Sequence, residues 1–332
     1  MPRLRALCCF VLLSLTSRSA NAHDAPGFDH LALEGFIRSM SERHGFDDAR
    51  LREIFSLARR DPFVLAAIAK PAEAKPWREY GPIFLNPERI SAGVGFWSAN
   101  VSRLQAAWSL YGVDPAIVVA IIGVETFYGR HAGRYRVIDA LSTLAFEYPD
   151  RAPFFRSELE HFLLFTREQQ MDPLALTGSY AGAMGLPQFM PSSYRSYAVD
   201  FDADGLTDIW SDPGDAIGSV ANYLQRHGWE RDGQVAVPAE VTGNGIESLI
   251  AADAWPTLDV AQIEQTGTRP QTPVAASAKV AVIALDAREY WLGLNNFYVL
   301  TRYNRSPLYA MAVHQLAEAI RHRYARTQGA AR

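Results

Sequence analysis

The chain is poor in cysteine, with only Cys8 and Cys9 among 332 residues. Both lie inside an apolar stretch near the N-terminus, from Ala6 to Leu15, which Arg3 and Arg5 precede. If this segment is removed after export, the product has no cysteine and cannot form a disulfide. Its stability must then come from a hydrophobic core or from a bound metal ion.

The same segment has the layout of a secretory signal peptide. The basic start and the apolar stretch are followed by "SANA", in which Ala20 and Ala22 fit an A-x-A cleavage site. The stretch is too short to span a bilayer, and a lipoprotein anchor would need a cysteine after it. We therefore expect residues 1–22 to be removed and the product to carry no membrane anchor; a retained anchor is the alternative.

An excess of basic charge is also absent. The chain has 32 basic and 36 acidic residues, and the first 22 residues hold three arginines and no acid, so 29 basic and 36 acidic residues remain, a formal charge of −7. This argues against nucleic acid or an anionic membrane as a partner. Removing 22 residues from 332 leaves 310, enough for one large domain or two packed lobes.

Helical spacing of apolar residues dominates the remaining chain. It predicts helices over residues 28–69, over about 92–111 and on to about residue 170, and a further helix over 213–228 that begins with proline at its first position. Residues 70–90 contain four prolines and predict an extended connector. In residues 231–300, "QVAVPAEV", "AKVAVIAL" and "NNFYVLTRY" alternate like strands, and a last helix follows at about 306–325. The predicted fold is mainly α (α+β), with one small β subdomain.

One carboxylate stands at the end of an apolar run, in "YGVDPAIVVAIIGVETFYGR", residues 111–130. Asp114 and Pro115 predict a helix start, and the residues after them predict burial on every side. Glu125 lies three turns on, where burial and the negative end of the helix dipole would both raise its pKa, as a general acid requires. The alternative is a structural glutamate paired with one of three arginines that follow: Arg130, Arg134 and Arg136.

A glycine-rich loop follows at residues 177–191. Gly178, Gly182 and Gly185 would let its backbone approach a ligand closely, and Ser179 and Gln188 would supply hydrogen bonds. A tight structural turn is the alternative.

An acidic stretch, "DFDADGLTDIWSDPGDAI", resembles the first half of an EF-hand calcium loop. Aspartates stand at positions 1, 3 and 5, glycine at 6, and the residue at 7 would offer its carbonyl: Asp200, Asp202, Asp204, Gly205 and Leu206. Position 12 is Ser211 rather than glutamate, so one of three further acids must complete the shell: Asp208, Asp212 or Asp215. Asp215 also fits a capping box with Asp212. Calcium suits this loop better than magnesium, and a solvated acidic turn is the alternative.

Five phrases together resemble the lytic murein transglycosylases of the B type, which are bacterial periplasmic enzymes. They are "IIGVETFYGR", "ALSTLAFEYPDRAPFF", "GSYAGAMGLPQFMPSSYRSYAVDFDADG", "DAIGSVANYLQRHGW" and "VLTRYNRSPLYAMAVHQL", spread over about residues 28–325. The resemblance implies a lysozyme-like helical core (about 114–230), a second helical lobe (about 28–113), the β subdomain and the closing helix. It implies a soluble periplasmic protein, because the lipid-bearing cysteine of many members is missing.

The resemblance also implies roles for individual residues. Glu125 matches the single catalytic acid/base, and Ser179 and Gln188 match residues that hold the sugar. Four further residues match the lining of the glycan cleft: Tyr80, Tyr223, Tyr303 and Asn304. The acidic loop matches a structural calcium site, with Asp200, Asp202, Asp204, Leu206 and Asp215 as ligands. Where members often have paired arginines this chain has Asp150 and Arg151, so only Arg151 carries over.

The mechanism that the resemblance implies uses no cofactor. Glu125 protonates the oxygen of the β-1,4 bond between N-acetylmuramic acid and N-acetylglucosamine in peptidoglycan, then acts as a base on the sugar's own 6-hydroxyl and closes a 1,6-anhydro ring. The expected partners are glycan strands and proteins that build or remodel the wall. A muramidase that uses water, and a non-catalytic glycan-binding protein, are the alternatives.

Overall fold

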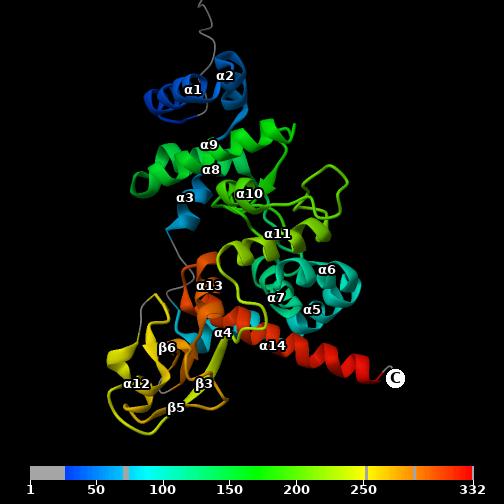
Figure 1. Ribbon diagram of the computed structural model, residues 1–332. Helices are drawn as coiled ribbons and strands as arrows, with labels where there is room; N and C mark the ends of the chain where they lie inside the picture. Colours follow the sequence, from blue (N-terminus) through cyan, green and yellow to red (C-terminus); the bar gives the residue numbers. More distant parts are fainter. Residues whose placement is uncertain (1–26, 70–74, 251–252, 287–288, 331–332) are drawn as a thin grey trace, which may run out of the picture.

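The computed structural model describes residues 27–69, 75–250, 253–286 and 289–330. The predicted signal peptide, residues 1–22, lies outside the described residues. The described part is mainly helical with a small five-stranded sheet, as predicted, and a separate two-stranded pair. Figure 1 shows the five-stranded sheet at the opposite end of the molecule from the N-terminal helices.

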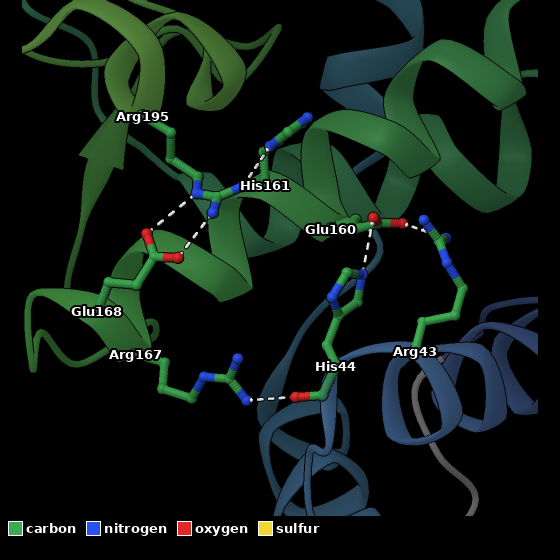
Figure 2. A network of polar contacts seen from close by, with 7 residues as sticks. All are labelled: Arg43, His44, Glu160, His161, Arg167, Glu168 and Arg195. Atoms are coloured by element: carbon green, nitrogen blue, oxygen red, sulfur yellow. Dashed lines mark hydrogen bonds and ion pairs between the residues drawn. The ribbon is translucent and has the colours of Figure 1, made fainter.

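The first helices pack on a long helical pair from the middle of the chain. Helices α1 (His30–His44), α2 (Asp48–Leu57) and α3 (Pro62–Ile68) lie near α8 (Val137–Glu147) and α9 (Ala152–Glu168), which pack on each other. Figure 2 shows the contacts that join α1 to α9: Glu160 binds Arg43 and His44 at 2.9 Å each, and Arg167 donates to the carbonyl of His44 at 2.9 Å. These charged contacts fix the end of α1 against α9.

The prediction of an extended connector at residues 70–90 is wrong for residues 75–90, which the structure describes. Residues 77–84 form α4 (Trp77–Phe84), and α5 (Pro87–Ala99) begins at Pro87, where Asn86 accepts a hydrogen bond from Arg89 N at 2.9 Å. Proline at the first position of a helix costs no hydrogen bond, so Pro87 marks a helix start, whereas Pro82 lies inside α4. Helix α6 (Val101–Tyr111) follows after a break at Asn100.

Two helices at the centre of the fold position the later site. Helix α7 (Pro115–Thr126) packs against α14 (Pro307–Ala330), and α14 also contacts α4, α5 and α13 (Asn295–Tyr303). Contacts between Asp114 and Arg321 at one end and Glu125 and Tyr309 at the other show that α7 and α14 run antiparallel. Helix α11 (Pro213–Arg226) packs on α6 and α7.

The short elements between α7 and α11 carry the glycine-rich loop. Strands β1 (Tyr135–Arg136) and β2 (Thr177–Gly178) pair in antiparallel fashion, η2 (Pro149–Arg151) precedes α9, and α10 (Pro191–Tyr197) follows the loop. The loop itself has no helix, as predicted.

The small sheet has the antiparallel order β4-β6-β7-β3-β5. Its strands are β3 (Ala236–Val241), β4 (Leu258–Asp259), β5 (Thr268–Pro270), β6 (Lys279–Ala284) and β7 (Tyr290–Gly293), with η3 (Ile246–Leu249) and α12 (Val260–Glu264) beside them. The strand predicted at "NNFYVLTRY" is wrong, because residues 295–303 form α13. Its buried residues 296, 297, 299, 300 and 301 follow helical rather than alternating spacing.

Among the residues that the structure describes, no single helix is long and apolar enough to cross a membrane; the bent pair α6 and α7 passes that test only jointly, by length and composition. The helices of residues 28–113 pack against two different parts of the fold, because α3 contacts α8 whereas α5 contacts α7 and α14. The domain boundaries given above therefore stay predictions.

Candidate active site

Glu125 lies one residue before the end of α7, as the sequence predicted. Asp114 caps the helix by accepting from Ala116 N at 2.8 Å, and residues 116–124 are buried. Glu125 itself is half-buried. The apolar helix thus carries its one carboxylate to the edge of the core.

A tight turn after Glu125 ends the helix. Phe127, Tyr128 and Gly129 all have positive φ, at 52°, 58° and 89°. The hydroxyl of Thr126 accepts from Gly129 N at 3.0 Å and lies 3.1 Å from the carbonyl oxygen of Leu186 in the glycine-rich loop. These contacts fix the position of Glu125 relative to that loop.

The arginines that could have made Glu125 a structural residue bind other partners. Arg130 pairs with Glu88 at 2.9 Å, and Arg136 pairs with Asp139 at 2.8 Å. Arg134 lies over the ring of Tyr135. Their described contacts therefore do not support the structural alternative.

Tyr309, near the start of α14, forms a hydrogen bond with Glu125. Its hydroxyl donates to Oε1 of Glu125 at 2.6 Å, and its side chain is 2 % exposed. Burial raises the pKa of Tyr309 well above its ordinary value, and the charge of Glu125 raises it further. The phenol therefore stays protonated and acts as a donor toward Glu125.

Tyr309 is a site residue that the sequence reasoning missed. It lies inside "SPLYAMAVHQL", whose Ser-Pro start predicts a helix, but the motif does not reveal which distant group it meets. The available signal was a tyrosine on the buried stripe of that helix, because a buried phenol usually has a hydrogen-bond partner.

A row of tyrosines continues from Tyr309. Tyr303 stacks beside it with ring centroids 6.3 Å apart, and Tyr223 meets Tyr303 edge-on at 4.8 Å. The hydroxyl of Tyr303 donates to the carbonyl of Pro187 at 2.6 Å, and that of Tyr223 donates to the carbonyl of Arg302 at 2.5 Å. The structure thus brings two predicted cleft residues to Glu125, with their hydroxyls bonded to backbone.

The other predicted cleft residues are placed differently. Tyr80 is buried on α4 and its charge affects the pKa of Tyr309, so it belongs to the same neighbourhood. Asn304 follows Tyr303 and accepts from Ser306 N at 3.2 Å. Arg151 lies over the rings of two phenylalanines on α9, and its described contacts are not with the Glu125 group.

Ser179 and Gln188 both bind the backbone around the glycine-rich loop. Ser179 Oγ accepts from Ala181 N at 3.2 Å and Ala183 N at 3.1 Å, and Gln188 Nε2 donates to the carbonyls of Ala132 and Gly185. Both side chains are half-buried. They shape the loop that Thr126 joins to the end of α7.

The glycines of this loop allow close approach to the protein itself. A Cβ atom on Gly182 would lie 2.4 Å from Leu141 Cδ2, and one on Gly185 would lie 2.5 Å from the carbonyl oxygen of Ile209. Both residues also have positive φ, at 83° and 66°. These glycines thus let the loop approach the protein's own core, and its approach to a ligand stays a prediction.

The acidic loop brings three carboxylates together. Oxygens of Asp200, Asp202 and Asp204 lie within 4.8 Å of one another, and all three residues are exposed. The pKa of Asp202 is raised, first by desolvation and then by the neighbouring carboxylates. Calcium binds oxygens at about 2.3–2.6 Å, so oxygens at this spacing fit one ion.

Asp215 lies behind that cluster. It is 2 % exposed, and its two carboxylate oxygens accept from Phe201 N and Asp208 N at 2.7 Å each. Asp212 caps α11 by accepting from Gly214 N and Asp215 N. Asp208 accepts from Trp210 N and Ser211 N at 2.9 Å each. Asp208, Asp212 and Asp215 therefore bind backbone N–H groups of the loop. They are not part of the cluster of Asp200, Asp202 and Asp204, whose oxygens lie close enough to share one ion. Leu206 is 58 % exposed at the loop's outer edge.

Comparisons with known proteins agree with this geometry. The family model described as "Transglycosylase SLT domain" matches residues 29–318. The membrane-bound lytic murein transglycosylase B of Escherichia coli (strain K12) is 46 % identical over 298 residues, covering 86 % of this chain and 81 % of that protein. The chain therefore belongs to the lytic murein transglycosylases, as the sequence predicted.

Solved structures show the same fold. The soluble lytic transglycosylase SltB1 of Pseudomonas aeruginosa has a TM-score of 0.83 at 51 % identity, over 90 % of this chain and 99 % of that chain. The E. coli lytic transglycosylase Slt35 in complex with calcium has a TM-score of 0.82 at 45 % identity, over 89 % and 94 %. SltB3 of P. aeruginosa, in complex with NAG-anhNAM-pentapeptide, has a TM-score of 0.78 at 30 % identity, over 87 % and 78 %. The lysozyme-like fold class is confirmed.

Proposed function

We propose that this enzyme cleaves the β-1,4 bond between N-acetylmuramic acid and N-acetylglucosamine of peptidoglycan and leaves 1,6-anhydro ends. The observation that carries the proposal is the contact between Tyr309 and Oε1 of Glu125 at the end of a buried helix. The hydrogen bond from a neutral phenol fixes Oε1 of this carboxyl group at the edge of the core. That arrangement suits one group that gives and then takes a proton.

In the proposed mechanism Glu125 protonates the glycosidic oxygen as the bond breaks. The 2-acetamido group of the sugar, or electrostatic support from the site, stabilises the positive centre. Glu125, now a carboxylate, takes the proton of the 6-hydroxyl while that oxygen bonds to the anomeric carbon. No water is consumed and Glu125 ends in its starting protonation state.

Ser179 and Gln188 are proposed to act through the loop that bears them. The ring closure competes with water only if the 6-hydroxyl points at the anomeric carbon, so geometry decides the product. The loop is joined to Glu125 through Thr126 and Leu186, and its shape depends on the hydrogen bonds of Ser179 and Gln188.

Calcium is proposed as a structural ion bound by Asp200, Asp202 and Asp204. Support comes from their oxygens lying within 4.8 Å and from the calcium complex of the E. coli structure. The ion has no role in the proton transfers. Asp215 is proposed to fix the loop from behind, as its two backbone hydrogen bonds favour.

The peptidoglycan substrate supports a periplasmic location for the exported protein, which we propose without a membrane anchor, unlike the membrane-bound E. coli relative. Mass analysis of products from purified murein sacculi tests the reaction. We expect ends lighter by one water than those of a hydrolytic muramidase. Reducing ends alone would identify a muramidase, and no products would identify a glycan-binding protein.

A further inference from the structure

A cavity lies at the other end of α7 from Glu125. It has a volume of about 770 Å³ and is bounded by α6, α7, β3, β7 and α14. Asp114 caps α7 beside this cavity, whereas Glu125 lies eleven residues further on. At 1.5 Å per residue this separation is about 16 Å along the helix, so the cavity is distinct from the site at Glu125.

Three tryptophans give the cavity its apolar walls: Trp108, Trp229 and Trp291. We call it the tryptophan pocket. Trp229 is 8 % exposed and the other two are half-buried. The guanidinium of Arg231 lies over the ring of Trp108, 5.0 Å from its centroid, and Trp291 donates to Glu289 at 3.1 Å. The rings are therefore held in position rather than loosely exposed.

The wall of the tryptophan pocket also carries hydrogen-bond donors and acceptors. Arg321 binds Asp114 at 2.6 Å and also contacts Glu318, and all three line the cavity. Because both carboxylates already bind the guanidinium, the triad carries one net negative charge; Asp232, which also lines the cavity, adds another, and the guanidinium of Arg231 over Trp108 offsets it. This is a weak attraction for a cation and no attraction for an anion.

His314 completes the wall between the triad and Trp291. Its side chain is 8 % exposed, its ring meets Trp291 edge-on at 5.7 Å, and burial lowers its pKa to about 4. Nδ1 is buried and has no hydrogen-bond partner among the described residues.

We propose that the tryptophan pocket binds a neutral N-acetylglucosamine unit of a glycan strand. A pyranose ring presents a flat C–H face that packs on an indole and hydroxyl groups at its edge that both donate and accept hydrogen bonds. The fixed indoles match the first feature, and the Asp114–Arg321–Glu318 triad matches the second. A ligand pocket is typically about 300–1,000 Å³, so the volume is adequate. The choice of a glycan rests on the proposed function, and the pocket would hold a strand at a distance from the cut bond.

The test uses the Glu125→Gln protein with ¹⁵N-labelled tryptophan and a trimer of N-acetylglucosamine. We expect the indole N–H signals of Trp108, Trp229 and Trp291 to shift and to saturate as the trimer is added. Trp255, which is 48 % exposed and packs on Tyr298, should not respond. Trp77, which lies beside Tyr80, reports binding near Glu125. Shifts of Trp77 alone, or of none, would overturn the proposal.

Two variants sharpen the test. Thr272→Trp places a bulky side chain on an exposed residue of the pocket wall, and Trp291→Ala removes one indole. Each should weaken trimer binding about tenfold or more, whereas the control Trp255→Ala should not. If Trp291→Ala unfolds, Thr272→Trp decides, and unchanged affinity in that variant contradicts the proposal.

A lysine-containing peptide that shifts the three indoles when the trimer does not would also contradict it. Binding of the trimer to the inactive Glu125→Gln protein is measured without turnover, so it does not depend on which reaction products the wild-type enzyme forms. Failure of the pocket and failure of the proposed function therefore give different results.

Discussion

The hydroxyl of Tyr309 lies 2.6 Å from Oε1 of Glu125, across 184 residues of sequence. The two side chains meet because α14 runs antiparallel to α7 and packs along its length. Tyr309 is buried and stays protonated, so it can only donate in this contact. This hydrogen bond therefore holds Oε1 of Glu125 against the start of α14.

Tyr309→Phe should keep the ring contact with Tyr303 and lose the hydrogen bond to Glu125. We expect kcat to fall by about tenfold or more, because one hydrogen bond to a charged group contributes about 1.5–3 kcal/mol. The pH profile of kcat should shift as well. Tyr324→Phe, on the same helix but stacked on Trp97, is the control. A normal rate and an unchanged pH profile would show that Tyr309 only packs.

Glu125→Gln should fold normally and lose turnover, because an amide cannot donate the proton. General acid–base catalysis typically contributes 10²–10⁴-fold, so we expect a loss of about that size on sacculi. The control is Glu88→Gln, which changes an exposed glutamate paired with Arg130. A loss below about tenfold would exclude Glu125 as the acid.

Ser179→Ala and Gln188→Ala should lower the rate and the fraction of 1,6-anhydro ends. Ser179 Oγ accepts two backbone hydrogen bonds, so its loss also destabilises the loop by about 1–3 kcal/mol. Chromatography with mass detection of both kinds of end gives the ratio. Ser109→Ala and Gln105→Ala, both on the exposed face of α6, are matched controls. Rates and ratios equal to wild type would make the loop purely structural.

Removing calcium should lower Tm. An ion bound only by the folded protein stabilises it by about 2.7 kcal/mol at a hundred times its Kd. Chelation should therefore decrease Tm by several degrees, and Asp200→Ala or Asp204→Ala should abolish that response. Asp150→Ala, which removes an exposed acid away from the loop, should retain it. Equal Tm values with calcium and with chelator would favour a solvated acidic turn.

His314 should make the protein less stable as the pH falls. Burial lowers its pKa to about 4, with the charge of Arg321 acting in the same direction and that of Glu318 opposing it; Trp291 packs on the ring. The unfolded chain takes up a proton near pH 6.5, before the folded one does, so stability is highest above about pH 6.5 and decreases toward pH 4. Tm measured across this range should show the slope. The same series on His314→Gln should be flatter, and equal slopes would assign the effect to other groups.

Much of the local structure could be predicted because its causes are local. Asp114 and Pro115 marked the start of α7, and Asp212 and Pro213 marked that of α11. The error at residues 295–303 arose because the sequence of this short apolar run is compatible with both helical and strand spacing. The prolines of residues 77–90 were interpreted as breaks although Pro87 starts a helix.

The contacts that define the site are not local, and this is why Tyr309 was missed. Motif spacing identified Glu125 and the glycine-rich loop, but not the bond from Thr126 to Leu186 that joins them. Nor did the composition reveal three tryptophans around one cavity, because they come from α6, from β7 and from the segment after α11. Contacts between residues so far apart in the sequence depend on how whole helices pack together.

The position of Tyr309 also bears on when activity begins. A chain emerges from the ribosome, and enters an export channel, from its N-terminal end. Glu125 is therefore made long before α14, which supplies its partner Tyr309 as well as His314, Glu318 and Arg321 of the tryptophan pocket. A nascent chain that ends before α14 has the carboxylate but not the hydroxyl that binds its Oε1. The order of synthesis thus delays assembly of a wall-degrading site until the last helix docks.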